Sequence, residues 1–545
     1  MGVRFGSWLR KLVRDPKEIA SMVALAALVG FAAYQVHSFW SNGVDDAFIT
    51  YRYADNLRAG KGLVFNPGER VEGTSSLLFT IMLAVAMALG GEPHFWARIF
   101  GGASFCGLVM VTYAFGRHLY SGPGRRILSL GAAALVAAAT PLAFYSTGGL
   151  ETDLYALLLT SAVALQIKNT PGWAFVWGLV ALARPEGAAF AALCLGIQWI
   201  FDYLEGRSFQ RASLAAARSL LRFLAVFGPV LIFRVAYYHE LLPNSVIAKG
   251  GFLAAHRGTS LMAWVQYLWA GPGAMLFRRF LAVWGAVLLL APLGIALPGR
   301  RRASALLAGI IAGTYALCVW DEGDWMGRYR LLTPAIAPLA LLLVLGLRSL
   351  LIAPAPLWRR LAWRGRNAVS ILLSLAVIAW CFDRLYYERH YRNPYAGNDY
   401  LTPIGKNLGA VMQPTDTLAT DMVGVVGFYS HMRMIDEMGL CDYHIAHNGT
   451  RFPTMGRLDH EYVASRRPTF FMFHGVGHMR VYYNDVSSFA SQREDYLVIM
   501  TPHARRAHDP GHRILAVRKD RPDLERVRQV FEAELIDPAV FLRSW

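Results

Sequence analysis

The sequence predicts an α-helical polytopic membrane protein with a C-terminal α/β domain. Of its 545 residues, 55% are hydrophobic and only 17% are charged, and the mean hydropathy is positive. Because soluble domains carry about 25% charged residues, this composition indicates an integral membrane protein. Residues 19–40 form a first apolar segment long enough to cross a bilayer, for which ~20 residues are needed. Hydropathy falls from Tyr386 onward, which predicts a domain outside the bilayer.

The charge pattern orients the predicted membrane spans. The net charge is +17, and the basic residues gather between apolar segments, as in the cytoplasmic loops of membrane proteins. We find no basic-aromatic pattern of a nucleic-acid module and expect no nucleic-acid partner. The tail before residue 19 is basic, so we place it in the cytoplasm. No signal-peptide cleavage pattern follows it, and we interpret residues 19–40 as a retained helix.

Further apolar segments predict about eleven crossings in total. Residues 75–89 are ambiguous, and only an interfacial, juxtamembrane position for them keeps every later basic loop inside. The other expected spans are 96–116, 127–146, 152–167, 172–184, 187–202, 218–237, 276–297, 303–320, 331–350 and 369–385.

The region from residue 386 to 545 is predicted to be a periplasmic α/β domain, and residues 1–385 the membrane domain. Short apolar runs predict strands, and the stretch T-D-M-V-G-V-V-G-F-Y-S-H predicts a strand, a turn and a helix. Its glycines make no G-x-G-x-x-G fingerprint, so no nucleotide site is expected. The expected strands are 417–420, 470–473, 496–500 and 514–517, with a helix around 524–534.

Two adjacent carboxylates, Asp45 and Asp46, follow the first span in V-D-D-A-F-I-T-Y-R-Y. Charges are costly in lipid, so this pair should face water or a polar cavity, where either could act as a general base. Arg52 lies seven residues after Asp45, on the same face of a helix, and could bind a phosphate. The alternative for all three residues is ordinary helix capping and surface charge.

Two further motifs place charges beside apolar spans. Glu151 lies in S-T-G-G-L-E-T-D-L-Y, and Arg184 and Glu186 lie in L-A-R-P-E-G. Charges within the membrane region favour a functional role. As alternatives, Glu151 could only cap a helix, and Arg184 could pair with either carboxylate.

The remaining polar motifs are H-E-L-L-P-N-S-V-I-A-K and D-E-G-D-W-M-G-R-Y-R. Arginine suits phosphate because its planar fork donates two hydrogen bonds. Mutual neutralisation of acids and arginines is the alternative. The predicted topology puts these four clusters on the outer side of the membrane. Together they indicate a cavity for a phosphorylated substrate. The residues they add are Asn244, Lys249, Asp324, Trp325, Arg328 and Arg330.

These segments resemble the GT-C superfamily of polyprenyl-phosphate-sugar glycosyltransferases. The resemblance rests on D-D-A-F-I-T-Y-R-Y-A-D-N-L, F-N-P-G-E-R-V-E-G, G-L-E-T-D-L-Y, L-A-R-P-E-G, L-L-P-N-S-V-I-A-K and G-D-W-M-G-R-Y-R, and reaches Y-S-H-M-R-M-I-D-E-M-G-L in the tail. The chain is most similar to the group with the terminal arabinofuranosyltransferase of mycobacterial cell-wall arabinan synthesis. It departs from many relatives at Thr74-Ser75-Ser76, where they have an aromatic residue and Asn-Pro.

The resemblance implies an acidic catalytic base in the first outer loop, which corresponds to Asp45 or Asp46. We therefore expect an inverting transfer of a sugar, with arabinofuranose favoured, from a polyprenyl phosphate to a glycan or protein acceptor outside the bacterial inner membrane. The expected cations for the donor phosphate are Arg52, Arg184, Lys249, Arg328 and Arg330, and the expected substrate contacts are Glu151, Glu186, Asn244, Asp324 and Trp325.

Other roles stay open at the level of sequence. A lipid-linked-sugar flippase would also need outward polar clusters, although we see no inverted repeat. A non-catalytic assembly factor is a further alternative. Asp45, Asp46, Asp321 and Asp324 could offer oxygen ligands to a divalent cation, but arginines can neutralise phosphate unaided, so we expect no obligatory metal or other cofactor.

Overall fold

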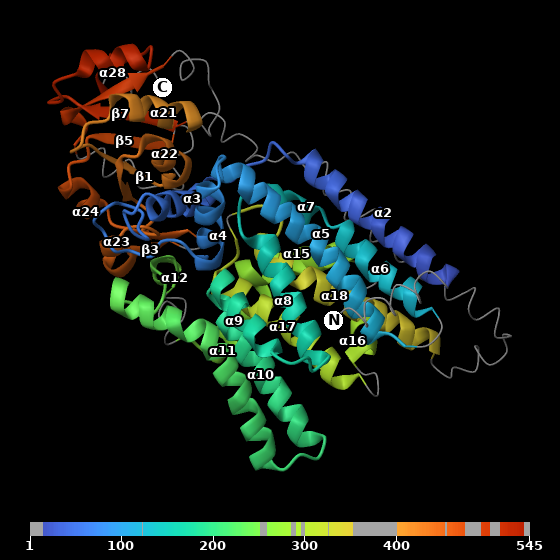
Figure 1. Cartoon of the computed structure of the whole chain (residues 1–545). Coiled ribbons are helices and arrows are strands. Elements are labelled where there is room, and N and C mark those ends of the chain that lie inside the picture. The colour runs from blue at the N-terminus through green and yellow to red at the C-terminus, as the bar shows by residue number, and fades with distance from the viewer. Residues whose placement is uncertain are drawn as a thin grey trace. The chain divides into compact units, whose positions relative to one another are not determined.

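The computed structural model describes the chain except residues 1–14, 122–123, 251–258, 285–289, 296–299, 325, 353–400, 453–454, 475–491, 502–512 and 539–545. The predicted span 369–385 and Trp325 therefore lie outside the described residues. The chain forms two compact units, each built from three separate segments (Figure 1). The first unit comprises Met1–Asn42, Phe95–Ile232 and Gly258–Asn393, and the second comprises Gly43–His94, Phe233–Arg257 and Pro394–Trp545.

The described part of the first unit is helical (Figure 1). Its helices are α2 (Pro16–Ser38), α5 (Pro93–Leu119), α6 (Arg125–Ala137), α7 (Thr140–Thr147), α8 (Thr152–Ile167), α9 (Trp173–Ala183), α10 (Glu186–Leu204), α11 (Phe209–Tyr238), α14 (Leu261–Ala270), α15 (Pro272–Trp284), α16 (Leu290–Ile295), α17 (Arg301–Trp320), η2 (Arg330–Leu332) and α18 (Thr333–Ile352). Helix α11 continues into the second unit.

Among the described residues, six helices are long and apolar enough to cross a membrane, and the bent pair α6 and α7 would make a seventh. Helix α18 is apolar all round and its apolar window is completely buried, as expected for the core of a bundle. Helices α8 and α9, on predicted spans, are shorter apolar helices. Helix α9 ends at Arg184 because Pro185 follows it. The structure therefore confirms a helical polytopic membrane protein.

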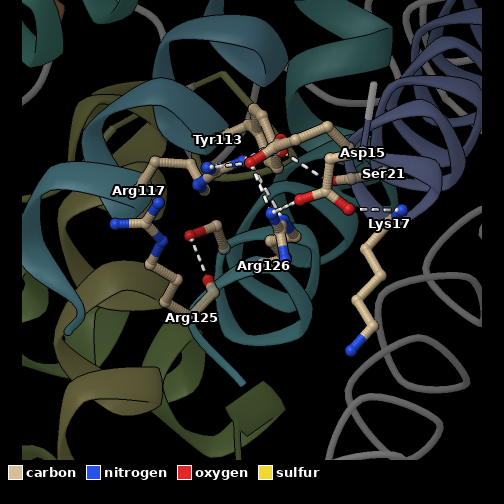
Figure 2. A network of polar contacts seen from close by, with 9 residues as sticks. Asp15, Lys17, Ser21, Tyr113, Arg117, Arg125 and Arg126 are labelled. Atoms are coloured by element: carbon tan, nitrogen blue, oxygen red, sulfur yellow. Dashed lines mark hydrogen bonds and ion pairs between the residues drawn. The ribbon is translucent and has the colours of Figure 1, made fainter. Parts of the chain in front are cut away.

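A network of charges ties together one end of α2, α5 and α6 (Figure 2). The Arg117 guanidinium donates two hydrogen bonds to the Glu18 carboxylate, at 2.8 and 2.9 Å, and one to Tyr113. Arg126 donates to the same carboxylate at 2.7 Å and to Asp15 at 2.6 Å. The basic residues at this end are therefore matched by acids of α2, which fixes the register between these helices.

The second unit combines helices with a mixed sheet (Figure 1). Its helices are α3 (Asp45–Arg58), α4 (Leu77–Ala88), α12 (Asn244–Lys249), α21 (Leu401–Val411), α22 (Val423–Ser430), α23 (Tyr443–Asn448), α24 (His460–Ser465), η5 (Arg493–Asp495) and α28 (Leu524–Val530). Its strands are β1 (Thr417–Thr420), β2 (Arg433–Asp436), β3 (Thr450–Phe452), β4 (Gly456–Leu458), β5 (Phe470–His474), β6 (Tyr496–Met500), β7 (Arg513–Arg518) and β8 (Glu534–Ile536).

The main sheet has the strand order β2-β1-β5-β7-β6-β8. Strands β2, β1 and β5 run parallel, and β7, β6 and β8 continue the sheet in antiparallel pairs. Alternate residues such as Phe471, Val498 and Ala516 are almost completely buried and form a core with neighbouring helices. The four predicted strands and the strand-turn-helix at β1 and α22 are confirmed. A helix over 524–534 is confirmed only to Val530, since β8 begins at Glu534.

Helix α4 occupies the ambiguous apolar segment 75–89. Its 12 residues span ~18 Å, which is too short for a hydrocarbon core of ~30 Å. Ser76 caps the helix by accepting the amide N–H of Phe79. The side chains of Ile81, Val85 and Leu89 recur every fourth residue and are 45%, 59% and 81% exposed, so α4 presents an apolar stripe.

Candidate active site

The two adjacent carboxylates of α3 have different environments. Asp45 is buried, and its carboxylate accepts the amide N–H groups of Gly424 at 3.0 Å and Val425 at 2.8 Å. These amides belong to the first turn of α22, where the helix dipole favours a negative charge. Asp45 therefore joins α3 to α22, which is a structural role.

Gly424 is required by this close packing. A Cβ atom at residue 424 would overlap with the main-chain carbonyl of Asp45 and approach its carboxylate. Main-chain atoms cannot yield as a flexible side chain can. Glycine is thus the residue that lets the amides of α22 reach the carboxylate of Asp45.

Asp46 is the better candidate for the general base. It lies in the first turn of α3 and is partly exposed. A base must be reachable by substrate, and the Asp45 carboxylate is buried against two amides. The sequence left the choice between the two open, and burial favours Asp46.

Asp436, at the end of β2, lies within the electrostatic influence of Asp46. Its buried carboxylate accepts the amide N–H groups of Met438 at 3.0 Å and Cys441 at 2.7 Å. Burial raises the pKa of Asp436 to about 7, and the charges of Asp442 and Asp46 add to this effect. A carboxyl that is partly protonated near neutral pH therefore belongs to the surroundings of the candidate base.

Arg52, which was expected to bind a phosphate, makes its hydrogen bonds within the second unit. The side chain is buried, and its guanidinium donates to the carbonyl oxygens of Phe65 at 2.8 Å, Gly427 at 2.7 Å and Met432 at 2.6 Å. A further bond reaches the Asn66 side chain at 3.3 Å. Its donors hold α3, the following loop and α22 together, which is a structural role for the residue predicted to bind a phosphate.

Asn244 is likewise structural, whereas Lys249 stays a candidate cation. The Asn244 amide donates to the carbonyl oxygens of Gly439 at 2.8 Å, Leu440 at 3.1 Å and Asp442 at 3.1 Å. It therefore ties α12 to the loop after β2, while its Oδ1 has no hydrogen-bond partner among the described residues. Lys249 ends α12, is partly exposed, and has no hydrogen bond or ion pair among the described residues.

In the first unit, the predicted residues Glu151, Arg184 and Glu186 form one network. Arg184 donates to Glu151 at 2.8 Å and to Glu186, and all three side chains are at least four-fifths buried. These contacts agree with the alternative that Arg184 pairs with Glu186 or Glu151, and they show that it pairs with both. Two carboxylates around one guanidinium leave a net negative charge, which does not favour a phosphate at this point.

The segment before α18 carries the other predicted residues of this unit. Arg330 is buried and pairs with Asp324 at 3.1 Å. The Arg328 guanidinium lies 4.8 Å from the ring centroid of Phe144 and 5.7 Å from that of Phe39, in cation–π geometry. The Asp324–Arg330 pair agrees with mutual neutralisation, and Arg328 stays a candidate cation.

Sequence reasoning missed one further buried ion pair, between Arg234 and Glu72. Arg234, near the end of α11, donates to both carboxylate oxygens of Glu72, with the shortest bond at 2.8 Å. Both side chains are about 95% buried. The sequence does indicate that Arg234 has a partner, because an arginine in an apolar span requires a nearby acid. What the sequence lacked was the identity of that acid, 162 positions away.

Comparison with known proteins identifies the fold and two curated relatives. A family model described as a domain of unknown function (DUF8728) matches residues 384–517. The chain is 32% identical, over 316 residues, to the terminal beta-(1->2)-arabinofuranosyltransferase of Mycobacterium tuberculosis, which covers 54% of this chain and 46% of that protein. It is 26% identical over 350 residues to the enzyme of the same name from Corynebacterium glutamicum, covering 55% and 48%.

The chain thus spans about half the length of the curated relatives it matches. Among solved structures, the archaeal oligosaccharyltransferase AglB from Archaeoglobus fulgidus, in complex with an inhibitory peptide and a dolichol-phosphate, matches with a TM-score of 0.56. The match covers 93% of this chain and 75% of AglB at 13% identity. The protein therefore has a GT-C-like fold and is homologous to the terminal arabinofuranosyltransferases.

Proposed function

We propose that this protein is an inverting arabinofuranosyltransferase that uses a polyprenyl-phosphate donor and a glycan acceptor. The observation that carries this proposal is the homology with the terminal arabinofuranosyltransferases, at 32% identity over 316 residues. A dolichol-phosphate bound by AglB, whose fold is similar, supports a lipid phosphate as the carrier. A protein acceptor has no comparable support from these two curated relatives.

Asp46 is the proposed general base. Its carboxylate removes the proton of the acceptor hydroxyl while the hydroxyl oxygen attacks the anomeric carbon. The bond from that carbon to the phosphate oxygen breaks, the configuration inverts, and polyprenyl phosphate leaves with its negative charge. Cations stabilise this developing charge, and the proposed contributors from the predicted set are Lys249 and Arg328.

The finer topology is part of the same proposal. Eleven crossings are proposed, including short spans at α8 and α9 and one at 369–385, with residues 1–385 as the membrane domain. We place the protein in the bacterial inner membrane, with residues 45–89 and 386–545 outside. The remaining proposed substrate contacts are Glu151, Glu186, Asp324 and Trp325.

The direct test compares Asp46→Asn with Asp45→Asn in the full chain, reconstituted with a polyprenyl-phosphate arabinofuranose and an arabinan oligosaccharide. Loss of a general base costs about 10²- to 10⁴-fold in rate, so Asp46→Asn is expected to abolish release of polyprenyl phosphate at unchanged melting temperature. Asp45→Asn is expected to lower the melting temperature, because one amide of α22 loses its charged acceptor.

Two outcomes would contradict the proposal. Full turnover of Asp46→Asn would remove its assigned role. Movement of labelled donor across vesicles without any sugar transfer by the unaltered protein would instead identify a flippase.

A further inference from the structure

Helices α3 and α22 lie side by side within the second unit and run in the same direction. The start of α22 contacts Asp45 through the amides of Gly424 and Val425. About two turns further along α3, Arg52 reaches the carbonyl of Gly427, in the second half of α22. The C-terminal ends of α3 and α22 therefore lie together. The candidate base, Asp46, is at the opposite end of α3.

A cavity of about 430 Å³ opens at that shared end. This volume falls in the range of about 300–1,000 Å³ that is typical of small-molecule sites. None of the residues that line the cavity takes part in the hydrogen bonds described around the candidate base. Its walls come from the end of α3, the end of α4 with the loop that follows, and the end of α22. The residues that line it are Asp55, Arg58, Met87, Gly91, Glu92, Pro93, Phe428, Tyr429 and His431.

The lining combines aromatic faces with carboxylates. Phe428 and Tyr429 are partly exposed and meet edge to face, with ring centroids 5.2 Å apart. Phe428 is backed by Phe48, at 5.8 Å between ring centroids, which fixes the wall of the cavity. Asp55 and Glu92 supply carboxylate oxygens, which accept hydrogen bonds from hydroxyl groups. A sugar is complementary to this lining, because its C–H faces stack on aromatic rings and its hydroxyl groups donate hydrogen bonds to carboxylates.

The charge of the cavity favours a neutral ligand. Arg58 is paired with Asp55 at 2.8 Å, which leaves Glu92 as the unbalanced charge of the lining. Burial and the charge of Arg52 lower the pKa of His431, so its imidazole is neutral near pH 7. Burial and the charge of Glu92 raise the pKa of Tyr429, so its phenol keeps its proton. An anionic headgroup would meet the Glu92 carboxylate, whereas a neutral polyol would not be repelled.

The cavity lies far from the candidate base along one rigid helix. Asp55 follows Asp46 by nine residues of α3, which is ~13 Å at 1.5 Å per residue. This separation exceeds the width of one sugar ring. A sugar in the cavity therefore differs from the sugar that reacts at Asp46.

We propose that this cavity binds a non-reacting sugar unit of the acceptor glycan, several residues from the end that receives arabinofuranose. The proposal rests on the proposed function for the identity of the acceptor. It predicts that long acceptors, but not short ones, use the cavity for affinity.

The test uses the full chain in nanodiscs with two acceptors, an arabinofuranose disaccharide and a hexasaccharide. Tyr429→Ala removes an aromatic contact, worth about a two- to tenfold change in affinity. We expect it to weaken hexasaccharide binding, measured without donor, and to raise the KM for the hexasaccharide by that factor. The disaccharide KM and the donor KM are expected to stay unchanged.

A control is Tyr443→Ala, which removes an exposed tyrosine of the same unit, outside the cavity. It is expected to leave both acceptors unaffected. Equal hexasaccharide binding by the unaltered chain and Tyr429→Ala would overturn the proposal. So would a change in binding of anionic-lipid vesicles with no change in hexasaccharide binding, which would identify a headgroup site.

Failure of the proposed function gives a different result. If the unaltered chain binds the hexasaccharide, Tyr429→Ala weakens that binding, and no sugar is transferred by either, the cavity is still a glycan site. The enzymatic assignment alone would then be wrong.

Discussion

At the scale of single residues, neighbours in the sequence can have separate tasks. Asp45 is buried against the amides of Gly424 and Val425, whereas Asp46 is partly exposed one position later. Successive residues of a helix point about 100° apart, so one side chain can face a neighbouring helix while the next faces a cavity. The helix dipole favours both carboxylates in this first turn. Packing therefore distinguishes the two carboxylates where helix propensity does not, and it leaves Asp46 as the proposed base.

Asp436 gives the second unit a pH-dependent stability. Its pKa is about 7 in the folded protein, against 3.8 ordinarily. Between these values the folded state holds one more proton than the unfolded state, so the free energy of unfolding falls as pH rises from about 4 to about 7, by ~1.4 kcal/mol per pKa unit. Asp436→Asn should remove this contribution, which makes the melting temperature less dependent on pH across that window.

Thermal unfolding at about pH 5 and about pH 8 measures this effect, with the exposed Asp495→Asn as the control. The control should retain the pH dependence of the unaltered chain. An unchanged pH dependence in Asp436→Asn would show that the carboxyl is charged when folded.

The sequence identified the residue types of the candidate site but not their partners. The D-D pair and the arginines were visible as motifs. The carbonyl acceptors of Arg52 belong to residues 427 and 432, some 380 positions away, and no local pattern predicts such pairing. The sequence therefore suggests a phosphate as the partner of Arg52, whereas in the structure its guanidinium donates to main-chain carbonyl oxygens. Buried hydrogen bonds to charged groups appear only when the tertiary structure is known.

At the scale of elements, the contact between α3 and α22 depends on the absence of a side chain. Gly424→Ala would place a Cβ atom against the carbonyl of Asp45 and force the helices apart. Both amide bonds to Asp45 would lengthen, and we expect a loss of about 2–4 kcal/mol in the free energy of unfolding of the unit.

Gly43→Ala is the matched control, because its Cβ would meet only the His94 ring at an ordinary 3.5 Å. Thermal unfolding of both variants measures the difference. Equal melting temperatures would mean that the α3–α22 contact is not as close as the packing indicates.

Helix α4 is expected to lie at the membrane interface and not across the bilayer. Its exposed stripe of Ile81, Val85 and Leu89 needs an apolar environment, yet the helix is only 12 residues long. A short helix that lies along the membrane buries its exposed apolar side ~5–10 Å into the boundary between headgroups and acyl chains. A fluorophore at Val85→Cys, in a chain whose five native cysteines are replaced, should be quenched best by lipids with a spin label near the headgroup.

The same fluorophore at Ala27→Cys, in the middle of the candidate span α2, is the control. It should be quenched best by a label near the end of the acyl chain. Deep quenching at both positions would indicate that residues 75–89 cross the membrane, and the orientation of every later loop would then change.

At the scale of the whole molecule, composition and hydropathy were sufficient for the fold class and for the strands of the tail. They could not show that the second unit contains residues 43–94 and 233–257 in addition to the tail, residues 394–545. A boundary at residue 385 follows the change in hydropathy, because hydropathy reports the environment of each residue. It does not report which distant segments share a core. Glu72 with Arg234, and Asn244 with the loop after β2, are contacts between such segments.

Because the second unit is built from three segments that bind one another, removing the tail should affect the other two. A chain that ends after residue 393 would lack the amides that bind Asp45 and the carbonyls of Gly427 and Met432 that bind Arg52. An uncompensated buried charge costs about 3–5 kcal/mol, so residues 43–94 are expected to unfold locally and to become sensitive to protease in nanodiscs. Co-expression of residues 394–545 as a separate chain should restore protection, because it returns the same hydrogen-bond partners. If residues 43–94 stayed protected in the truncated chain alone, α3 would fold without α22, and the tail would only cover a unit that is already complete.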